Sequence, residues 1–392
     1  MLRVARNVDI LARLGEVDLF SLYDTTADTP VVPDHVRIKR LGLTPYPAPG
    51  SVVHSAVKGH LVNRLPWHVA LRSRDGRPRD ECRAFHQPPY DVVWISTAAT
   101  WEWLGRPHFG PTIIDLIDLE DVKVLQQAAL DRSAGGERAG ALSARWREQV
   151  KTRFEAGTWR HLQKNAVRLA ERVVVSSEID AVRLGSPKAV VVPNTFTRPA
   201  QSVGSSAPGR PPTIVFPATF DYPPNAEGAQ WLVREVAPRL ATRVPGARIC
   251  LAGRSTPEVE ALAAPPAITV TGFVSSMEDQ LAQADVVIVP LLRGSGTRLK
   301  ILEAMAHRVP VVSTTIGAEG LDVADGVHLL VADTPDEMAR AVARYQDDPD
   351  LRARIVDAAE ARFLDRYEDG VAEVRIRELV DELVPPPAPA RW

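Results

Sequence analysis

Short apolar runs rich in β-branched residues recur through the second half of the chain, at residues 213–217, 248–252, 268–271, 286–290, 310–313 and 329–331. Each run is continuously apolar rather than alternating, which is typical of strands buried on both faces of a parallel sheet. The segments between them have helical periodicity, at residues 226–243, 257–263, 277–284, 297–307 and 335–346. This alternation of strand and helix predicts a doubly wound α/β domain.

The first half shows the same alternation less regularly. Its candidate strands are residues 17–22, 36–40, 92–96, 112–116, 172–176 and 189–193, and its candidate helices are 3–14, 52–63 and 143–170. Residues 132–140 combine Gly, Ser and charge, so we expect a mobile loop there. This half therefore predicts a second α/β domain.

A segment with almost nothing to bury separates the two halves. Residues 197–212 are rich in Pro, Ser, Gly and Ala, which is typical of a linker. We therefore predict Rossmann-like domains at residues 1–196 and 213–370, followed by a C-terminal helix and tail at 371–392. A length of 392 residues suits two domains. Ligands of such sheets bind at the carboxyl ends of the strands, so we expect the site in a cleft between the domains.

Composition narrows the function classes. The formal net charge of −2 argues against nucleic acid as a partner, because neutralising phosphates needs a basic surface. The two cysteines, Cys82 and Cys250, lack metal-ligand spacing, and no cluster of His, Cys and Asp demands a metal. No apolar run approaches the roughly 20 residues of a membrane span, and Arg3, Asn7 and Asp9 interrupt any secretory signal. We therefore expect a cytoplasmic protein.

Peripheral membrane contact stays open. Arg3, Arg6 and Arg13 on the first predicted helix would favour an anionic membrane surface, although a solvated helix face is the better explanation. The sequence leaves the oligomeric state open.

The segment with the clearest chemistry is a Gly-rich turn between the strand at 286–290 and the next helix. It contains Gly294, Ser295, Gly296 and Thr297, and Arg298 and Lys300 follow at the start of the helix. Glycine permits a positive φ and close approach of the backbone, and the helix start offers unpaired N–H groups and a positive dipole end. With two full positive charges beside it, this turn predicts a diphosphate site.

Glu303 lies one turn after Lys300 on the same predicted helix. A carboxylate beside a phosphate site needs a separate role, and accepting hydrogen bonds from the vicinal hydroxyls of a ribose is such a role. The alternative is an ordinary ion pair of Glu303 with Arg298 or Lys300 on a solvated helix face.

Other turns are expected at the same edge of the sheet. One contains Gly317, a second places Arg254 directly after a strand, and a third contains Phe273. Backbone groups of the third turn would read the edge of a base, with Phe273 alongside. A phenylalanine of the core is the alternative for that residue.

Taken in order, these pieces resemble the donor domain of glycosyltransferase family 4, the large retaining family with the GT-B fold. The resemblance runs from residue 213 to about 367. It rests on residues 216–225, 244–247, 251–254, 272–274, 284–286, 294–303, 310–312, 320–321, 330–331 and 348–349.

The resemblance implies two Rossmann-like doubly wound domains facing a central cleft, with the last helix crossing back onto the first domain. It implies transfer of a sugar, with retention, from a nucleotide-diphosphate sugar to an acceptor hydroxyl. UDP and GDP are the favoured donor nucleotides, and no metal or further cofactor is expected. The acceptor stays open between a polysaccharide, a lipid-linked sugar and a small natural product.

The resemblance also implies roles for individual residues. Lys300 would bind the diphosphate and Glu303 the ribose, while Arg254 would face the nucleotide. The turn residues would approach the phosphates and the sugar through their backbone: Gly294, Ser295, Gly296 and Thr297.

The chain departs from the family pattern at three places. Ser295 stands where relatives commonly have a second glutamate. The turn after residues 112–116 lacks the histidine of many relatives; Asp118 in that turn would orient the sugar or the acceptor hydroxyl, or is an acidic helix N-cap. Relatives also begin with a strand, whereas this sequence begins with a helix. Trp101 and Trp103 would stack on a sugar or pack in the core.

Two competing functions remain. One is a non-catalytic partner protein with the same fold, and the other is a nucleotide-sugar epimerase, which would need acid and base groups that the sequence does not reveal.

Overall fold

The computed structural model describes residues 2–23, 36, 38–46, 58–73, 75–87, 89–134, 142–199, 211–294 and 297–384. The chain divides into two compact units, which we call unit 1 (Met1–Val192 and Ala372–Trp392) and unit 2 (Pro193–Val371). Residues 200–210 of the predicted linker and 135–140 of the predicted loop lie outside the described residues.

Unit 2 contains a parallel sheet of six described strands. In chain order they are β7 (Thr213–Pro217), β8 (Arg248–Ala252), β9 (Ile268–Val270), β10 (Val286–Val289), β11 (Val311–Ser313) and β12 (Leu330–Val331). Their order in the sheet is β12-β11-β10-β7-β8-β9, and every neighbouring pair is parallel. This is the strand order of a dinucleotide-binding Rossmann sheet. All six strands agree with the apolar runs of the sequence.

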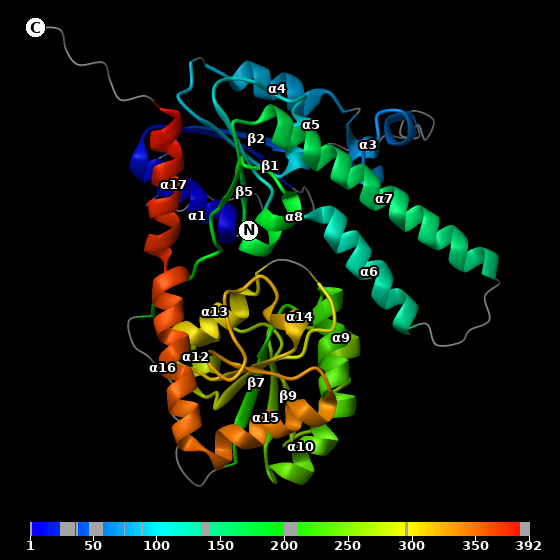
Figure 1. Ribbon diagram of the computed structural model, residues 1–392, viewed down its shortest axis with the longest axis vertical. Coiled ribbons are helices and arrows are strands. Elements are labelled where there is room, and N and C mark those ends of the chain that lie inside the picture. The colour runs from blue at the N-terminus through cyan, green and yellow to red at the C-terminus, as the bar shows by residue number, and fades with distance from the viewer. Residues whose placement is uncertain are drawn as a thin grey trace, which may run out of the picture. The chain divides into compact units, whose positions relative to one another are not determined.

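Helices cover both faces of this sheet (Figure 1). The predicted helix at 226–243 begins earlier and is interrupted by a π-helical turn at Leu232–Val236. The helices are α9 (Pro223–Trp231), α10 (Ala237–Arg243), α11 (Pro257–Glu260), α12 (Met277–Ala282), α13 (Leu299–Ala306), α14 (Thr315–Ala318), α15 (Pro335–Asp347) and α16 (Pro349–Arg366).

The described strands of unit 1 form two separate sheets. In the first sheet, β1 (Val17–Tyr23) pairs with β2 (Ile38–Pro45) in parallel orientation. The second sheet has the order β3-β4-β5-β6, again all parallel, with β3 (Val93–Ser96), β4 (Thr112–Asp115), β5 (Arg172–Val175) and β6 (Ala189–Val191). The first described element is a helix, as the sequence predicts, and no described strand joins β1 to β3.

The helices of unit 1 include several short ones that the sequence pattern did not predict. The helices of unit 1 are α1 (Leu2–Leu14), α3 (Trp67–Arg72), α4 (Arg77–Phe85), α5 (Ala98–Trp103), α6 (Glu120–Ala134), α7 (Leu142–Leu169) and α8 (Glu178–Leu184), of which α1 and α7 agree with the predicted helices at 3–14 and 143–170. Of the predicted helix at 52–63, residues 58–61 are helical and 52–57 lie outside the described residues. Trp101 and Trp103 are buried in α5, in one cluster with Trp159, so they pack in the core and do not offer a stacking surface.

The last helix, α17 (Asp369–Leu383), crosses from unit 2 into unit 1, as the family resemblance implies. Its buried residues Ala372, Ile376 and Leu379 belong to the same apolar cluster as Ile10 of α1 and Val174 of β5. The guanidinium of Arg13 on α1 lies 2.7 Å from the carboxylate of Glu373 on α17. The helix is therefore part of the unit 1 core.

Candidate functional site

The strand order of unit 2 reverses between β7 and β10, which are neighbours in the sheet although β8 and β9 separate them in the sequence. Helix α9 follows β7 and helix α13 follows β10, so both turns begin at one point of the carboxyl edge. Gly228 of α9 packs there against the backbone, because a Cβ on it would lie 2.8 Å from the carbonyl oxygen of Pro290. In open α/β sheets such a switch point is where ligands bind.

Lys300 connects the two strand ends at this switch point. It lies half-buried in the first turn of α13, and its Nζ donates a hydrogen bond of 2.9 Å to Oδ1 of Asn225 on α9. The same Nζ lies 4.6 Å from the centre of the Phe216 ring on β7. Asn225 is itself fixed, since its Nδ2 donates to the carbonyl oxygen of Thr219 at 2.8 Å. The sequence analysis gave Asn225 no role.

Two ionisable groups of α13 have pKa values shifted toward neutrality. Burial, with the nearby charge of Arg298, lowers the pKa of Lys300 to about 7, while Glu303 opposes this shift. Burial also raises the pKa of Glu303 to about 7, against the effect of Lys300. A bound anion next to Lys300 would favour its charged form, so this site is sensitive to the charge of its ligand.

The solvated-face ion pair that the spacing of Lys300 and Glu303 allows is not formed. The Lys300 amine is directed to Asn225 instead. The half-buried Glu303 carboxylate accepts no hydrogen bond and forms no ion pair with any part of the chain that the structure describes. A carboxylate in this state can accept hydrogen bonds from ligand hydroxyls.

The Gly-rich turn lies directly before α13. Gly294 has a φ of +117°, and a Cβ there would lie 2.8 Å from Nη2 of Arg298. The buried Arg298 guanidinium therefore packs against this turn, and Arg298 is also the N-cap residue of α13, without a capping side-chain hydrogen bond. Thr297 is half-buried beside it, while Ser295 and Gly296 lie outside the described residues.

The turns after β8 and β9 lie next along the same edge. Gly253 has a φ of +132°, and a Cβ there would lie 2.0 Å from the carbonyl oxygen of Ala218 in the turn after β7. The guanidinium of Arg254 is exposed and lies 3.6 Å from the Asp221 carboxylate. Phe273 is 82% exposed, so its interpretation as a core residue is wrong.

Gly317, in the turn after β11, has a packing reason for being glycine. A Cβ there would lie 2.3 Å from Oγ of Ser313 and 2.8 Å from the carbonyl oxygen of Val289 at the end of β10. Its N–H donates to Oγ1 of Thr314, which caps α14. The ends of β8, β9, β10 and β11 thus bring Arg254, Phe273, Gly294, Lys300 and Gly317 to a single edge of the unit 2 sheet.

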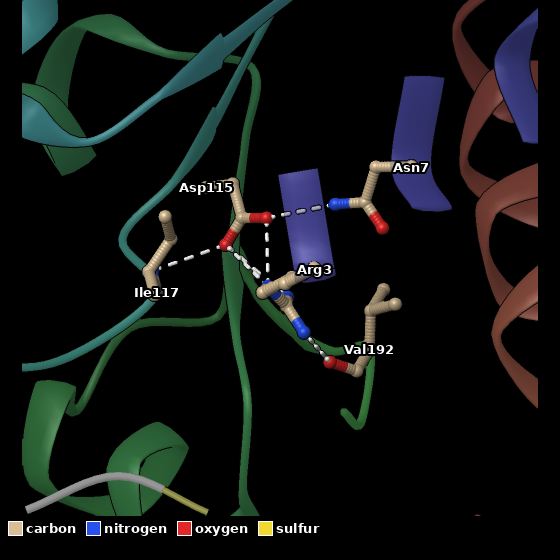
Figure 2. Close-up of polar contacts among 5 residues, drawn as sticks. All are labelled: Arg3, Asn7, Asp115, Ile117 and Val192. Carbon is tan, nitrogen blue, oxygen red and sulfur yellow. Dashed lines mark hydrogen bonds and ion pairs between the residues drawn. The ribbon is translucent and has the colours of Figure 1, made fainter. Parts of the chain in front are cut away.

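A buried polar cluster occupies the carboxyl end of β4 in unit 1 (Figure 2). Asp115, the last residue of β4, is fully buried and accepts hydrogen bonds from Nε of Arg3 at 2.9 Å and Nδ2 of Asn7 at 3.0 Å. Nη1 of Arg3 also donates to the carbonyl oxygen of Val192 at 2.8 Å. Arg3 is therefore inside the protein, and both sequence interpretations of it, as a solvated or a membrane-facing residue, are wrong.

The same carboxylate shapes the turn that contains Asp118. Oδ1 of Asp115 accepts a hydrogen bond of 3.1 Å from the N–H of Ile117, whose φ is +57°. Asp118 follows, half-buried, with its carboxylate 3.9 Å from Nζ of Lys123. Helix α6 begins at Glu120, so Asp118 is not its N-cap residue.

Two further features concern only the residues that the structure describes. No group of three or more His, Cys, Asp or Glu side chains among them could hold a metal ion. None of the described helices is long and apolar enough to cross a membrane.

Comparison with known proteins agrees with this fold. Residues 211–348 match the family model for Glycosyl transferases group 1. A Klebsiella pneumoniae protein, described as an uncharacterized 44.6 kDa protein in the cps region, is 30% identical over 132 residues, which are 31% of this chain and 34% of that protein. The match thus spans about a third of the length of this relative.

Solved glycosyltransferases resemble the chain over almost its whole length. Sucrose-phosphate synthase from Thermosynechococcus elongatus has a TM-score of 0.66 at 17% identity, covering 97% of this chain and 92% of that one. HepE of Anabaena, solved with UDP and glucose, has a TM-score of 0.58 at 16% identity, covering 97% and 95%. A glycosyltransferase from Rickettsia africae has a TM-score of 0.61 at 12% identity, covering 97% and 94%. Residues 211–348 therefore match the family model for Glycosyl transferases group 1, and the chain as a whole has the GT-B fold.

Proposed function

We propose that the protein transfers a sugar, with retention of configuration, from a nucleotide-diphosphate sugar to an acceptor hydroxyl. The observation that carries the proposal is Lys300, held by Asn225 at the switch point of the unit 2 sheet, with the Glu303 carboxylate one turn further along α13. The structure of HepE contains UDP, which makes UDP the first nucleotide to test here.

Each candidate site residue of unit 2 has a defined role in this proposal. The diphosphate lies at the start of α13, where Lys300, Arg298 and the helix dipole stabilise the charge that develops on it. Glu303 accepts hydrogen bonds from the ribose hydroxyls, and Phe273 and Arg254 contact the nucleotide. The backbone of the turn that contains Gly294 and the turn that contains Gly317 approach the phosphates and the sugar.

The reaction exchanges one bond at the anomeric carbon. Its bond to the β-phosphate oxygen breaks, the acceptor oxygen bonds to the same carbon, and the hydroxyl proton leaves with the nucleoside diphosphate. Asp118 orients the sugar or the acceptor hydroxyl. The reaction proceeds without a metal and takes place in the cytoplasm, consistent with the free thiols of Cys82 and Cys250.

Binding of nucleoside diphosphates tests the proposal. Thermal unfolding is measured with UDP, GDP, ADP and TDP, each with and without EDTA. UDP is expected to raise the unfolding temperature selectively and independently of EDTA, because a ligand at 100 times its Kd stabilises the folded state by about 2.7 kcal/mol. A well-folded protein that responds to none of the four would contradict the proposal.

The Glu303→Ala variant distinguishes ribose recognition from general charge effects. It is expected to weaken UDP binding by about tenfold or more, since hydrogen bonds to charged groups contribute about 1.5–3 kcal/mol. Binding of 2′,3′-dideoxy-UDP, which lacks the hydroxyls, should change far less. Glu235→Ala, on the exposed side of unit 2, is the control. If the variant bound both nucleotides more weakly by the same factor, Glu303 would not contact the ribose hydroxyls.

In the Glu303→Gln variant, residue 303 does not titrate, so the pH dependence of Lys300 can be measured alone. The affinity of this variant for UDP is expected to fall as the pH rises above 7. Burial lowers the pKa of Lys300 to about 7 in the wild-type chain, loss of the Glu303 charge lowers that pKa further, and a bound diphosphate would raise it again. Above pH 7 the complex then holds a proton that the free protein lacks, so affinity falls by up to about tenfold per pH unit. The terminal phosphate of UDP is already ionised there, since its pKa is about 6.

Isothermal titration calorimetry at pH 7, 8 and 9, in buffers of different ionisation enthalpy, measures this proton uptake. A second variant that also carries Lys300→Met should show neither the uptake nor the pH dependence. An affinity that rises with pH, or that is flat while Lys300 is present, would show that Lys300 does not face the diphosphate.

A further inference from the structure

Helix α7 has an exposed apolar stripe on the side opposite its buried residues. Trp146, Val150 and Phe154 are 66%, 46% and 40% exposed, and their spacing of four residues places them on one side of the helix. Its buried residues Trp159 and Leu162 fall on the other side of the same helix. The end of α7 that carries the stripe extends away from the strands of unit 1, beside α6 (Figure 1).

A second segment extends this apolar surface. The ring of His60 lies 4.9 Å from the ring of Phe154 and 5.5 Å from the ring of Trp67, centre to centre. Leu61 and Val62, directly after His60, are 58% and 68% exposed. We call the set of Leu61, Val62, Trp67, Trp146, Val150 and Phe154 the α7 patch. Exposed apolar groups gathered in this way mark an interaction site.

The charges around the α7 patch are mainly positive. Arg147 and Lys151 flank the stripe on one side and Arg153 on the other, and all three are exposed. Lys58 and Arg64 add exposed positive charge next to Leu61 and Val62. Two acidic residues of this part of α7 oppose these five cations: Glu148 pairs with Lys151, and Glu155 accepts a hydrogen bond from the Trp67 N–H and lies 3.9 Å from the His60 ring. The excess is local, because the whole chain has a formal charge of −2.

We propose that the α7 patch binds the surface of an anionic membrane. A helix side with Trp, Val and Phe flanked by Lys and Arg is suited to the boundary between headgroups and acyl chains, where the apolar side chains insert and the cations meet anionic lipid. A second copy of the chain is a poorer occupant. It would bring the same positive charges of both copies together in one interface.

Co-sedimentation with lipid vesicles tests this. The protein is expected to bind vesicles containing a third phosphatidylglycerol, to bind pure phosphatidylcholine at least tenfold more weakly, and to be released by salt. The apolar variant Trp146→Ser with Val150→Ser, and the charge variant Arg147→Gln with Lys151→Gln, should each reduce binding at least tenfold. Both should bind UDP like the wild-type chain, so this test is separate from the proposed function.

Matched controls come from exposed residues elsewhere in unit 1. Val182→Ser with Val374→Ser removes similar apolar surface, and Arg375→Gln with Arg377→Gln removes the same charge from α17. The proposal would be overturned if these control variants lost as much vesicle binding as the patch variants do. It would also be overturned if the wild-type chain did not bind anionic vesicles. Light scattering could also show that the wild-type chain is a dimer and that the apolar variant is a monomer. That result would overturn the membrane proposal and would identify a second copy of the chain as the occupant of the α7 patch.

Discussion

Replacing Lys300 by methionine is expected to lower kcat for cleavage of the donor by about 10²–10³-fold, with the fold retained. This is the range that follows the loss of one group aimed at developing charge in an enclosed site. Lys300 occupies that position, because its Nζ lies at the switch point of the sheet, hydrogen-bonded to Asn225 and next to the Phe216 ring. Methionine fills the same space without a charge, so the variant should unfold at a similar temperature or higher.

The acceptor is unidentified, so the reaction to measure is the release of UDP from UDP-glucose with water as the acceptor. Arg239→Met, which removes an exposed charge of α10 in unit 2, is the control and should leave the rate unchanged. Lys300→Arg should restore little activity, because its planar guanidinium does not fit the space of a compact ammonium. Unchanged turnover in the Lys300→Met variant would show that Lys300 does not contribute to the reaction. Binding of UDP without any turnover by the wild-type chain would favour a non-catalytic partner protein.

The sequence predicted the unit 2 sheet well, because its strands are buried on both faces and appear as continuous apolar runs between helical segments. It did not predict the short helices of unit 1. Helices α3 and α5 have six residues each, which is less than two turns, so no helical periodicity is visible in them. For the same reason the sequence left Trp101 and Trp103 open between stacking on a sugar and packing in the core, whereas the structure buries them in α5.

The site was predicted where its signal is local. Lys300 and Glu303 follow a Gly-rich turn at a helix start, so spacing and family resemblance were sufficient to name them as candidates. Asn225 was missed because its bond to Lys300 joins residues 75 positions apart, and only the strand order brings them together. The Arg3–Asp115 pair, 112 positions apart, was missed for the same reason. No sequence motif marks either contact.

Replacing Arg3 by methionine is expected to reduce the free energy of unfolding of unit 1 by about 3–5 kcal/mol, because it leaves the buried Asp115 carboxylate without its cation. Arg13→Met on the same helix is the matched control. Arg13 is half exposed and pairs with Asp9 and Glu373, so its loss should cost about 1 kcal/mol or less. The comparison separates a buried ion pair from a surface one within a single helix.

Urea unfolding followed by tryptophan fluorescence measures this in unit 1, because Trp231 is the one tryptophan of residues 193–371. Adding Asp115→Leu to Arg3→Met should recover part of the loss, since no charge is then buried alone. Recovery should be incomplete, because the N–H of Ile117 loses its acceptor at a cost of about 1–3 kcal/mol. Arg3→Met could instead reduce the free energy of unfolding by no more than Arg13→Met does. That result would show that the Asp115 carboxylate reaches water, and that no buried ion pair holds the turn before Asp118.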